Sequence, residues 1–220
     1  MDYETEEQQI EALKKWWKEN SSQIFAGIAI GAILIGGWRY YGSYQQTHAE
    51  YASQSYENIV RIISTSSDTT DAQAKANELY ASYSDTPYAS LSALMLAKKQ
   101  LQKGDVQQAS QQLEWVINNA QQPELTFIAR LRLARVLMAS KNNDKALELI
   151  NIDFPTSFTA LYEELKGDIY VSKGEPDQAR VAYDKAILSS AGQTSKWLKL
   201  KRDDLGSIDL TKTNMAEPAT

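Results

Sequence analysis

The sequence contains no cysteine and only one histidine among its 220 residues. The absence of cysteine excludes disulfide bonds, thiolate zinc sites, iron–sulfur clusters and cysteine nucleophiles. A single histidine excludes a metal site with two histidine ligands from one chain. Lys and Arg total 23 against 28 Asp and Glu, a formal net charge of -5, so the composition is not that of a uniformly basic nucleic-acid-binding protein. We therefore expect no nucleic acid partner.

Sequence motifs of common enzymes are missing as well. Outside one apolar stretch the glycines are isolated, so no Gly-rich loop could hold a phosphate group. Neither a G-x-S-x-G nor an H-E-x-x-H pattern occurs. His48, the sole histidine, lies just after the apolar stretch on a helix that we expect to be exposed. We therefore predict that the protein is not an enzyme, with no catalytic residue, no cofactor and no metal site.

One long apolar run stands out from this polar sequence. Residues 24–38 read IFAGIAIGAILIGGW, which is 15 residues without a charged or strongly polar group. A membrane-spanning helix needs about 20 residues, so the flanking residues must decide. Trp16, Trp17 and Trp38 lie at the two ends of the run, and tyrosines follow it, as is typical of membrane–water interfaces. We predict a transmembrane helix over 23–43.

Two other interpretations of this run are weaker. A cleaved signal peptide needs small residues after its apolar part, whereas this run ends in W-R-Y-Y. A buried core helix of a soluble protein would not explain aromatic residues at both ends.

Small residues within the run have the spacing of four that lets two membrane helices pack closely, although they are also common in such helices. They are Gly27, Gly31, Ala32 and Gly36.

The residues before the run indicate its orientation. Lys14, Lys15 and Lys18 precede it and only Arg39 follows it closely, so the positive-inside rule places the N-terminus in the cytoplasm. We expect a single-pass protein with a cytoplasmic stub over 1–22 and with the chain after residue 43 on the opposite side, which in a bacterial inner membrane is the periplasm. The stub contains a short amphipathic pattern, whose apolar side either lies in the inner leaflet or contacts a partner.

The remainder of the chain contains a repeated pattern. Small, aromatic and turn residues have offsets of 3, 7, 12, 16 and 19, which match the 34-residue tetratricopeptide repeat. In the clearest unit they are Gly167, Tyr170, Gly174, Ala179, Tyr183 and Ala186. The same spacing recurs in two earlier units, at Ala97, Gly104, Ala109 and Leu113, and at Ala134, Leu137, Ala146 and Ile150, with Lys141 at the glycine position.

This pattern predicts an all-α fold. A single N-terminal transmembrane helix is followed by a tetratricopeptide-like solenoid of helical hairpins over 44–206, and then by a disordered tail over 207–220. The last helix is expected to cap the solenoid. The predicted helices after the span cover 43–65, 71–84, 88–103, 106–120, 124–140, 143–150, 157–173, 176–190 and 194–204.

A solenoid of this kind has a concave surface lined by the first helix of each hairpin. A mostly apolar lining with a few mixed charges suits a hydrophobic peptide or a partner helix, and argues against a clamp for acidic C-terminal peptides. Alternatively, the capping helix or tight packing fills the groove. The predicted lining comprises Leu91, Leu94, Lys98, Leu101, Ile128, Leu131, Arg135, Met138, Leu161, Glu164, Asp168 and Val171.

The N-terminal sequence resembles the YfgM family. The strings T-E-E-Q-Q and W-W-K-E-N before a single span are the specific part of the match, which extends over nearly the whole chain. The resemblance implies an inner-membrane protein of proteobacteria, an ancillary subunit of the SecYEG translocon with a periplasmic repeat domain. It implies as partners SecYEG, the membrane-anchored periplasmic chaperone PpiD, nascent secreted proteins and a cytoplasmic stress-response regulator.

Two functions follow as expectations. The first is a membrane-anchored interaction protein at the SecYEG translocon that aids chaperone-assisted handling of secreted proteins. The alternative is a periplasmic repeat scaffold that coordinates envelope or cell-wall assembly.

Overall fold

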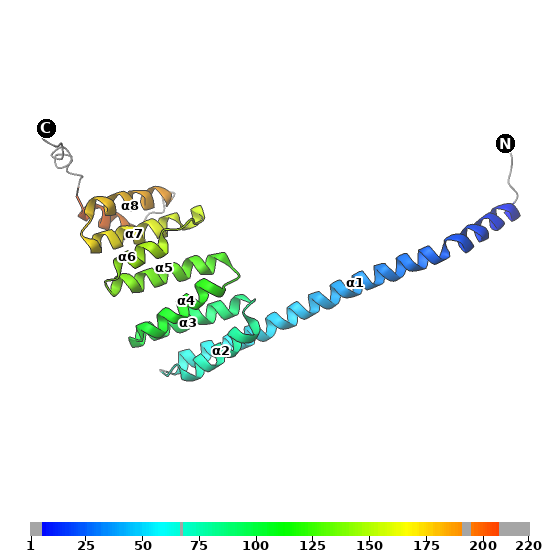
Figure 1. The fold of residues 1–220 in the computed structure, drawn as a ribbon, viewed down its shortest axis with the longest axis horizontal. Coiled ribbons are helices and arrows are strands. Elements are labelled where there is room, and N and C mark those ends of the chain that lie inside the picture. The colour runs from blue at the N-terminus through cyan, green and yellow to red at the C-terminus, as the bar shows by residue number, and fades with distance from the viewer. Residues whose placement is uncertain (1–5, 67, 191–194, 207–220) are drawn as a thin grey trace, which may run out of the picture. The chain divides into compact units, whose positions relative to one another are not determined.

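The computed structural model describes residues 6–66, 68–190 and 195–206, with side chains from residue 8 onward. This part of the chain is helical and contains no strand, which confirms the all-α prediction (Figure 1). The chain divides into two units, Met1–Tyr51 and Ala52–Thr220. The predicted tail over 207–220 and the predicted start of the last helix at 194 lie outside the described residues. The elements are α1 (Glu6–Thr65), α2 (Thr70–Tyr83), α3 (Pro87–Lys103), α4 (Val106–Asn119), α5 (Pro123–Ala139), α6 (Asn143–Ile150), the 3-10 turn η1 (Thr156–Phe158), α7 (Thr159–Lys173), α8 (Pro176–Ser189) and α9 (Lys196–Asp204).

The first element, α1, is longer than the sequence pattern predicted. It joins the stub, the apolar run and the predicted helix over 43–65 in one helix of 60 residues. The boundary near residue 43 is therefore not a helix end. No proline occurs between residues 6 and 65, and each glycine inside a helix costs only about 1 kcal/mol relative to alanine. Nothing in the local sequence ends the helix there.

The remaining helices form hairpins, of which α3–α4, α5–α6 and α7–α8 correspond to the three predicted units (Figure 1). The turns explain where each first helix ends. Gly104 and Gly174 have φ angles of 85° and 76°, in the left-handed region that glycine adopts without a steric penalty. Lys141 takes the same conformation at the corresponding position, with a φ of 62°. The predicted register is thereby confirmed in the backbone.

In each hairpin a small residue of the first helix and a large residue of the second, 16 positions later, are buried where the two helices pack. Ala97 and Leu113 are buried in one core cluster, and Ala134 and Ile150 are buried in another. In α7–α8 the small residue is Gly167, and a Cβ atom at that position would overlap the ring of Tyr183. The tyrosine therefore fills the space that an alanine side chain takes in the other hairpins.

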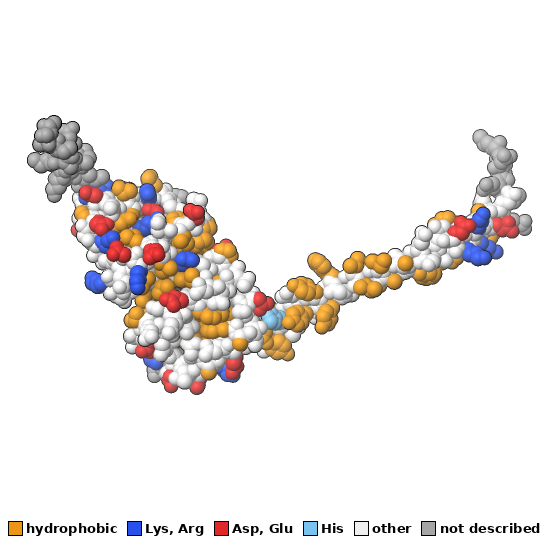
Figure 2. Space-filling view, in the orientation of Figure 1, with side chains coloured by type: hydrophobic (Ala, Val, Ile, Leu, Met, Phe, Trp, Pro, Cys, Tyr) orange, Lys and Arg blue, Asp and Glu red, His pale blue; other side chains and the backbone are white. Residues whose placement is uncertain are grey.

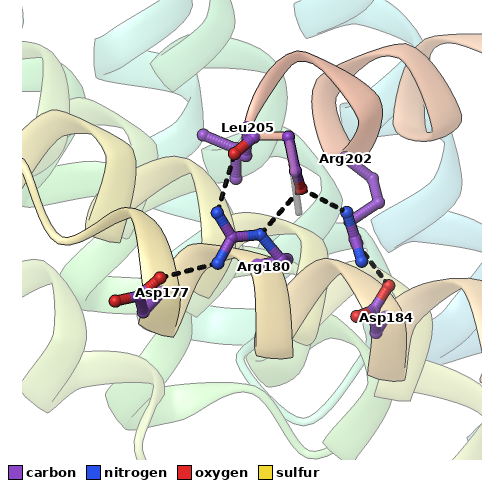
Figure 3. Close-up of polar contacts among 6 residues, drawn as sticks. Asp177, Arg180, Asp184, Arg202 and Leu205 are labelled. Atoms are coloured by element: carbon purple, nitrogen blue, oxygen red, sulfur yellow. Dashed lines mark hydrogen bonds and ion pairs between the residues drawn. The ribbon is translucent and has the colours of Figure 1, made fainter. Parts of the chain in front are cut away.

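The last helix, α9, covers the end of the solenoid as predicted. Its Leu198 is buried in a cluster with residues of α8. Figure 3 shows the polar part of this contact, centred on the buried guanidinium of Arg180. Arg180 donates to the carbonyl oxygens of Leu205 and Gly206, over 2.7 Å and 3.0 Å, and pairs with Asp177. A buried charge needs such partners, so this network holds the end of α9 against α8.

Candidate functional site

The apolar run in α1 is exposed on all sides of the helix. Ile33, Leu34 and Trp38 are 73%, 68% and 82% exposed. Figure 2 shows apolar side chains along this stretch and charged side chains gathered towards its N-terminal end. Among the described residues, α1 is the one helix long and apolar enough to cross a membrane, and none of its apolar window is buried. The structure thus contradicts the alternative of a buried core helix.

The glycines of the run pack against no other element in the part of the chain that the structure describes. A Cβ atom at Gly27, Gly31 or Gly36 would meet nothing within 4 Å beyond its chain neighbours and the nearby backbone of α1. Ala32 lies on the same exposed stretch. Their use as a contact for another membrane helix stays a prediction.

The predicted groove residues divide into three groups. Lys98, Leu101, Arg135, Leu161 and Val171 are exposed, and Leu91, Ile128, Met138, Glu164 and Asp168 are half-buried. Leu94 and Leu131 are buried, at 5% and 3% exposed, so they cannot line an open groove.

Leu94 and Leu131 are buried because their positions face the next repeat. Leu94 lies in one cluster with Ala129 and Leu133 of α5. Leu131 lies in another cluster with Tyr162 and Leu165 of α7. Both leucines therefore hold neighbouring hairpins together, and the prediction that they line the groove was wrong.

The structure forms a groove between α3, α4 and α5, which we call the α3–α5 groove. Its volume is about 770 Å³. It brings together Lys98, Leu101 and Arg135 from the predicted set. Sequence reasoning missed its other lining residues; Arg132 could have been found, because it lies three positions before Arg135 on the same helix face. The complete lining is Ala97, Lys98, Leu101, Gln102, Val106, Leu113, Arg132, Arg135, Val136, Ala139 and Ser140.

The charges of the α3–α5 groove have one sign. Its lining contains Lys98, Arg132 and Arg135 and no carboxylate. The Arg132 guanidinium donates to the carbonyl oxygen of Leu94 over 3.4 Å. Desolvation, and secondly the positive charge of Arg135, lower the pKa of Arg132. The mixture of charges expected over the whole predicted lining, which includes Glu164 and Asp168, is not present in this groove.

The corresponding surface of α7 differs. The Lys201 ammonium of α9 lies 2.9 Å from Glu164 Oε1 and 2.8 Å from Asp168 Oδ1. Here the capping helix occupies predicted groove positions, as the alternative interpretation proposed. Leu161 and Val171 are left exposed beside it.

No catalytic or metal site is evident in the described part of the chain. It contains no group of three or more His, Asp and Glu residues that could hold a metal ion. The ring of His48 stacks on Tyr44, with 5.8 Å between the ring centroids.

Comparisons with known proteins agree with this architecture. A family model described as "Tetratricopeptide repeat-like domain" matches residues 14–207. Three relatives each carry the name "Ancillary SecYEG translocon subunit". A Haemophilus influenzae protein is 32% identical, over 91% of this chain and 97% of its own length. The Escherichia coli K12 protein is 29% identical, over 92% and 98% respectively. A Neisseria gonorrhoeae protein is 25% identical, over 83% and 87%.

The chain belongs to the YfgM family. The resemblance seen in its N-terminal strings is thereby confirmed over almost the full length of the relatives. The family match includes most of α1 as well as the hairpins, so the apolar helix is part of what the YfgM family shares. No solved structure matches the chain.

Proposed function

We propose that this protein is a membrane-anchored ancillary subunit of the SecYEG translocon. Residues 23–43 of α1 cross the inner membrane, the stub over 1–22 lies in the cytoplasm, and the hairpins of 44–206 lie in the periplasm. The exposed apolar run, with lysines on its N-terminal side, is the observation that carries the anchor. The names of the relatives support the translocon as the complex.

The anchor keeps the repeat domain close to the translocon. A domain tethered beside the channel exit has a high effective concentration towards emerging chains and towards a second anchored protein, so weak contacts suffice. We propose that the domain aids chaperone-assisted handling of secreted proteins. The family resemblance supports PpiD as the chaperone and a stress-response regulator as a partner of the stub.

Purification of the full-length protein from membranes in mild detergent tests the complex. We expect SecYEG subunits and a membrane-anchored chaperone to co-purify in near-stoichiometric amounts. The matched control replaces residues 23–43 by an unrelated span of equal length. If the control loses SecYEG but keeps the chaperone, the span contacts the channel and the hairpins contact the chaperone. Recovery of cell-wall synthesis proteins without SecYEG would contradict the proposal and favour the envelope scaffold.

Orientation can be tested with single cysteines, because the chain has none of its own. Glu11 and Gln121 are both exposed, one before the span and one between α4 and α5. In cells with a permeabilised outer membrane, an impermeant maleimide should label Gln121→Cys and should label Glu11→Cys only after lysis. The opposite pattern would contradict the topology. Loss of residue 11 from the membrane-bound protein would instead show cleavage of a signal peptide.

A further inference from the structure

The α3–α5 groove combines an apolar floor with three basic side chains. Leu101 and Val106 are 37% and 42% exposed, so apolar surface is open to solvent there. Lys98, Arg132 and Arg135 line the same groove, and no carboxylate is among the lining residues. We propose that the α3–α5 groove binds an amphipathic peptide segment of a partner, which places carboxylates against these three cations and apolar side chains against the floor. This binding chemistry does not depend on the translocon assignment.

The three cations are not paired with a carboxylate in the part of the chain that the structure describes. Among the described residues, none of the ion pairs involves Lys98, Arg132 or Arg135. Arg132 bonds to a backbone carbonyl instead, and Arg135 lies one helical turn further along α5. Desolvation lowers the pKa of Arg132, and the repulsion between the two guanidinium groups lowers it further. A carboxylate in the groove would relieve this repulsion and form charge-assisted hydrogen bonds.

Helix stabilisation does not account for these charges. A cation stabilises a helix through the macrodipole when it lies in the last turn. The last turn of α5 contains no basic residue, since Arg132 and Arg135 precede it. In α3 the basic residue of the last turn is Lys103, which is not part of the groove.

In the last hairpin, the position that corresponds to Lys98 and Arg135 is covered by another segment of the chain. Asp168, Lys98 and Arg135 each lie six residues before the left-handed residue of their hairpin, at 174, 104 and 141. Asp168 receives a charge of opposite sign from Lys201 of α9, and the same helix inserts Leu198 into the core. The chain thus supplies its own amphipathic segment in that hairpin. Lys98 and Arg135 carry the charge opposite to that of Asp168, and the described chain supplies no amphipathic segment to cover them.

Peptide binding to the full-length protein in phosphatidylcholine nanodiscs tests the proposal. The probe is a fluorescein-labelled helical peptide with leucines along one face and two glutamates beside them, one turn apart. Matched peptides replace both glutamates by glutamine or by lysine, and empty nanodiscs control for lipid binding. We expect the glutamate peptide to bind at least about ten-fold more tightly than the glutamine peptide, as one or two charge-assisted hydrogen bonds would give. The lysine peptide should show no binding.

Two double variants locate the effect. Lys98→Gln with Arg135→Gln should abolish the preference for glutamate over glutamine, and Lys98→Glu with Arg135→Glu should transfer binding to the lysine peptide. The control is Arg130→Gln with Lys145→Gln. It removes two charges from the groove between α4, α5 and α6, where Arg130 also donates to a backbone carbonyl. This control should keep the preference, and thermal unfolding followed by circular dichroism confirms that each variant is folded.

Three results would overturn the proposal. The first is equal binding of the glutamate and glutamine peptides. The second is an equal loss of preference in the two glutamine variants, which would reflect only the total charge of the protein. The third is tighter binding of a synthetic peptide with the sequence of residues 207–220, which would make a segment of this chain the occupant in place of a partner.

Discussion

The α3–α4 and α7–α8 hairpins follow the same plan with different side chains. Both end their first helix at a left-handed glycine, and both bury a small residue against a large one 16 positions later. The first hairpin uses Ala97 with Leu113, whereas the last uses Gly167 with Tyr183. Two different pairs of residues therefore fill the corresponding space between the two helices of each hairpin.

The two hairpins also differ in the charge on their exposed side. Lys98 in α3 is exposed without an ion pair among the described residues, whereas Asp168 in α7 is paired with Lys201. A hairpin inside an array is covered by the next hairpin, but the terminal one needs a separate cap. The paired charges therefore belong to the closed end, and the cationic groove belongs to the interior of the array.

The largest effect is expected where the small and large residues touch. Gly167→Ala should lower the free energy of unfolding by about 2–3 kcal/mol, because the new methyl group overlaps the buried ring of Tyr183. Urea denaturation followed by circular dichroism measures the change. Adding Tyr183→Leu recreates the Ala97–Leu113 combination and should recover part of the loss. A double variant less stable than Gly167→Ala alone would contradict the volume exchange.

Removing the charge of the cap should have a smaller effect. Lys201→Met leaves the carboxylates of Glu164 and Asp168 without their cation and should destabilise the protein by about 1 kcal/mol, since the pair is partly open to solvent. The midpoint of thermal unfolding should fall accordingly. Lys199→Met removes the same charge from an exposed position of α9 and should leave the midpoint unchanged. Equal effects of the two substitutions would show that only net charge matters.

Alkaline pH should weaken the packing of α7 and α8. Desolvation raises the pKa of Tyr162 to about 12, and it raises the pKa of Tyr183 further, with a contribution from Asp168. Because these values lie above that of an unfolded tyrosine, about 10, the stability they contribute is complete below pH of about 10 and is lost as the pH rises through the folded-state values. Tyrosinate absorbance and circular dichroism should therefore change together. Tyr183→Phe should move that transition to higher pH; an unshifted transition would contradict this assignment.

The smallest effect is expected at the turn between α5 and α6. Lys141 adopts a left-handed conformation that costs a non-glycine residue about 1 kcal/mol. Lys141→Gly should therefore stabilise the protein by up to about 1 kcal/mol, reduced by the greater freedom of glycine in the unfolded chain. Gly104→Ala should have the opposite sign. Chemical denaturation of both variants measures the difference, and a loss of stability in Lys141→Gly would contradict the argument.

Most of the fold could be predicted because the repeat signals are local. Prolines at 87, 123 and 176 begin helices, glycines at 104 and 174 end them, and the small and large residues have a fixed spacing. The continuity of α1 was missed because a change from apolar to polar residues does not by itself end a helix. Polarity and helix formation are separate properties of a sequence.

Less of the candidate site could be predicted. The helical period shows that Leu94, Lys98 and Leu101 share a face, but the angle between hairpins decides which part of that face is covered. Leu94 is covered by α5, and Arg132 is brought beside Lys98 from another hairpin. Both outcomes depend on contacts between residues more than 30 positions apart, which a single sequence does not reveal.

Arg180 of α8 depends on hydrogen-bond acceptors that are synthesised after it. Its guanidinium is 4% exposed and depends on the carbonyl oxygens of Leu205 and Gly206, at the end of the described chain. A chain is made from its N-terminus, so Arg180 lacks both carbonyl acceptors until residue 206 has been added. The α3–α4 hairpin has no such dependence on residues after α9. In an unfinished chain α7 and α8 can therefore already pack through Gly167 and Tyr183, whereas the contact of α8 with the end of α9 forms only after residues 205 and 206 have been added.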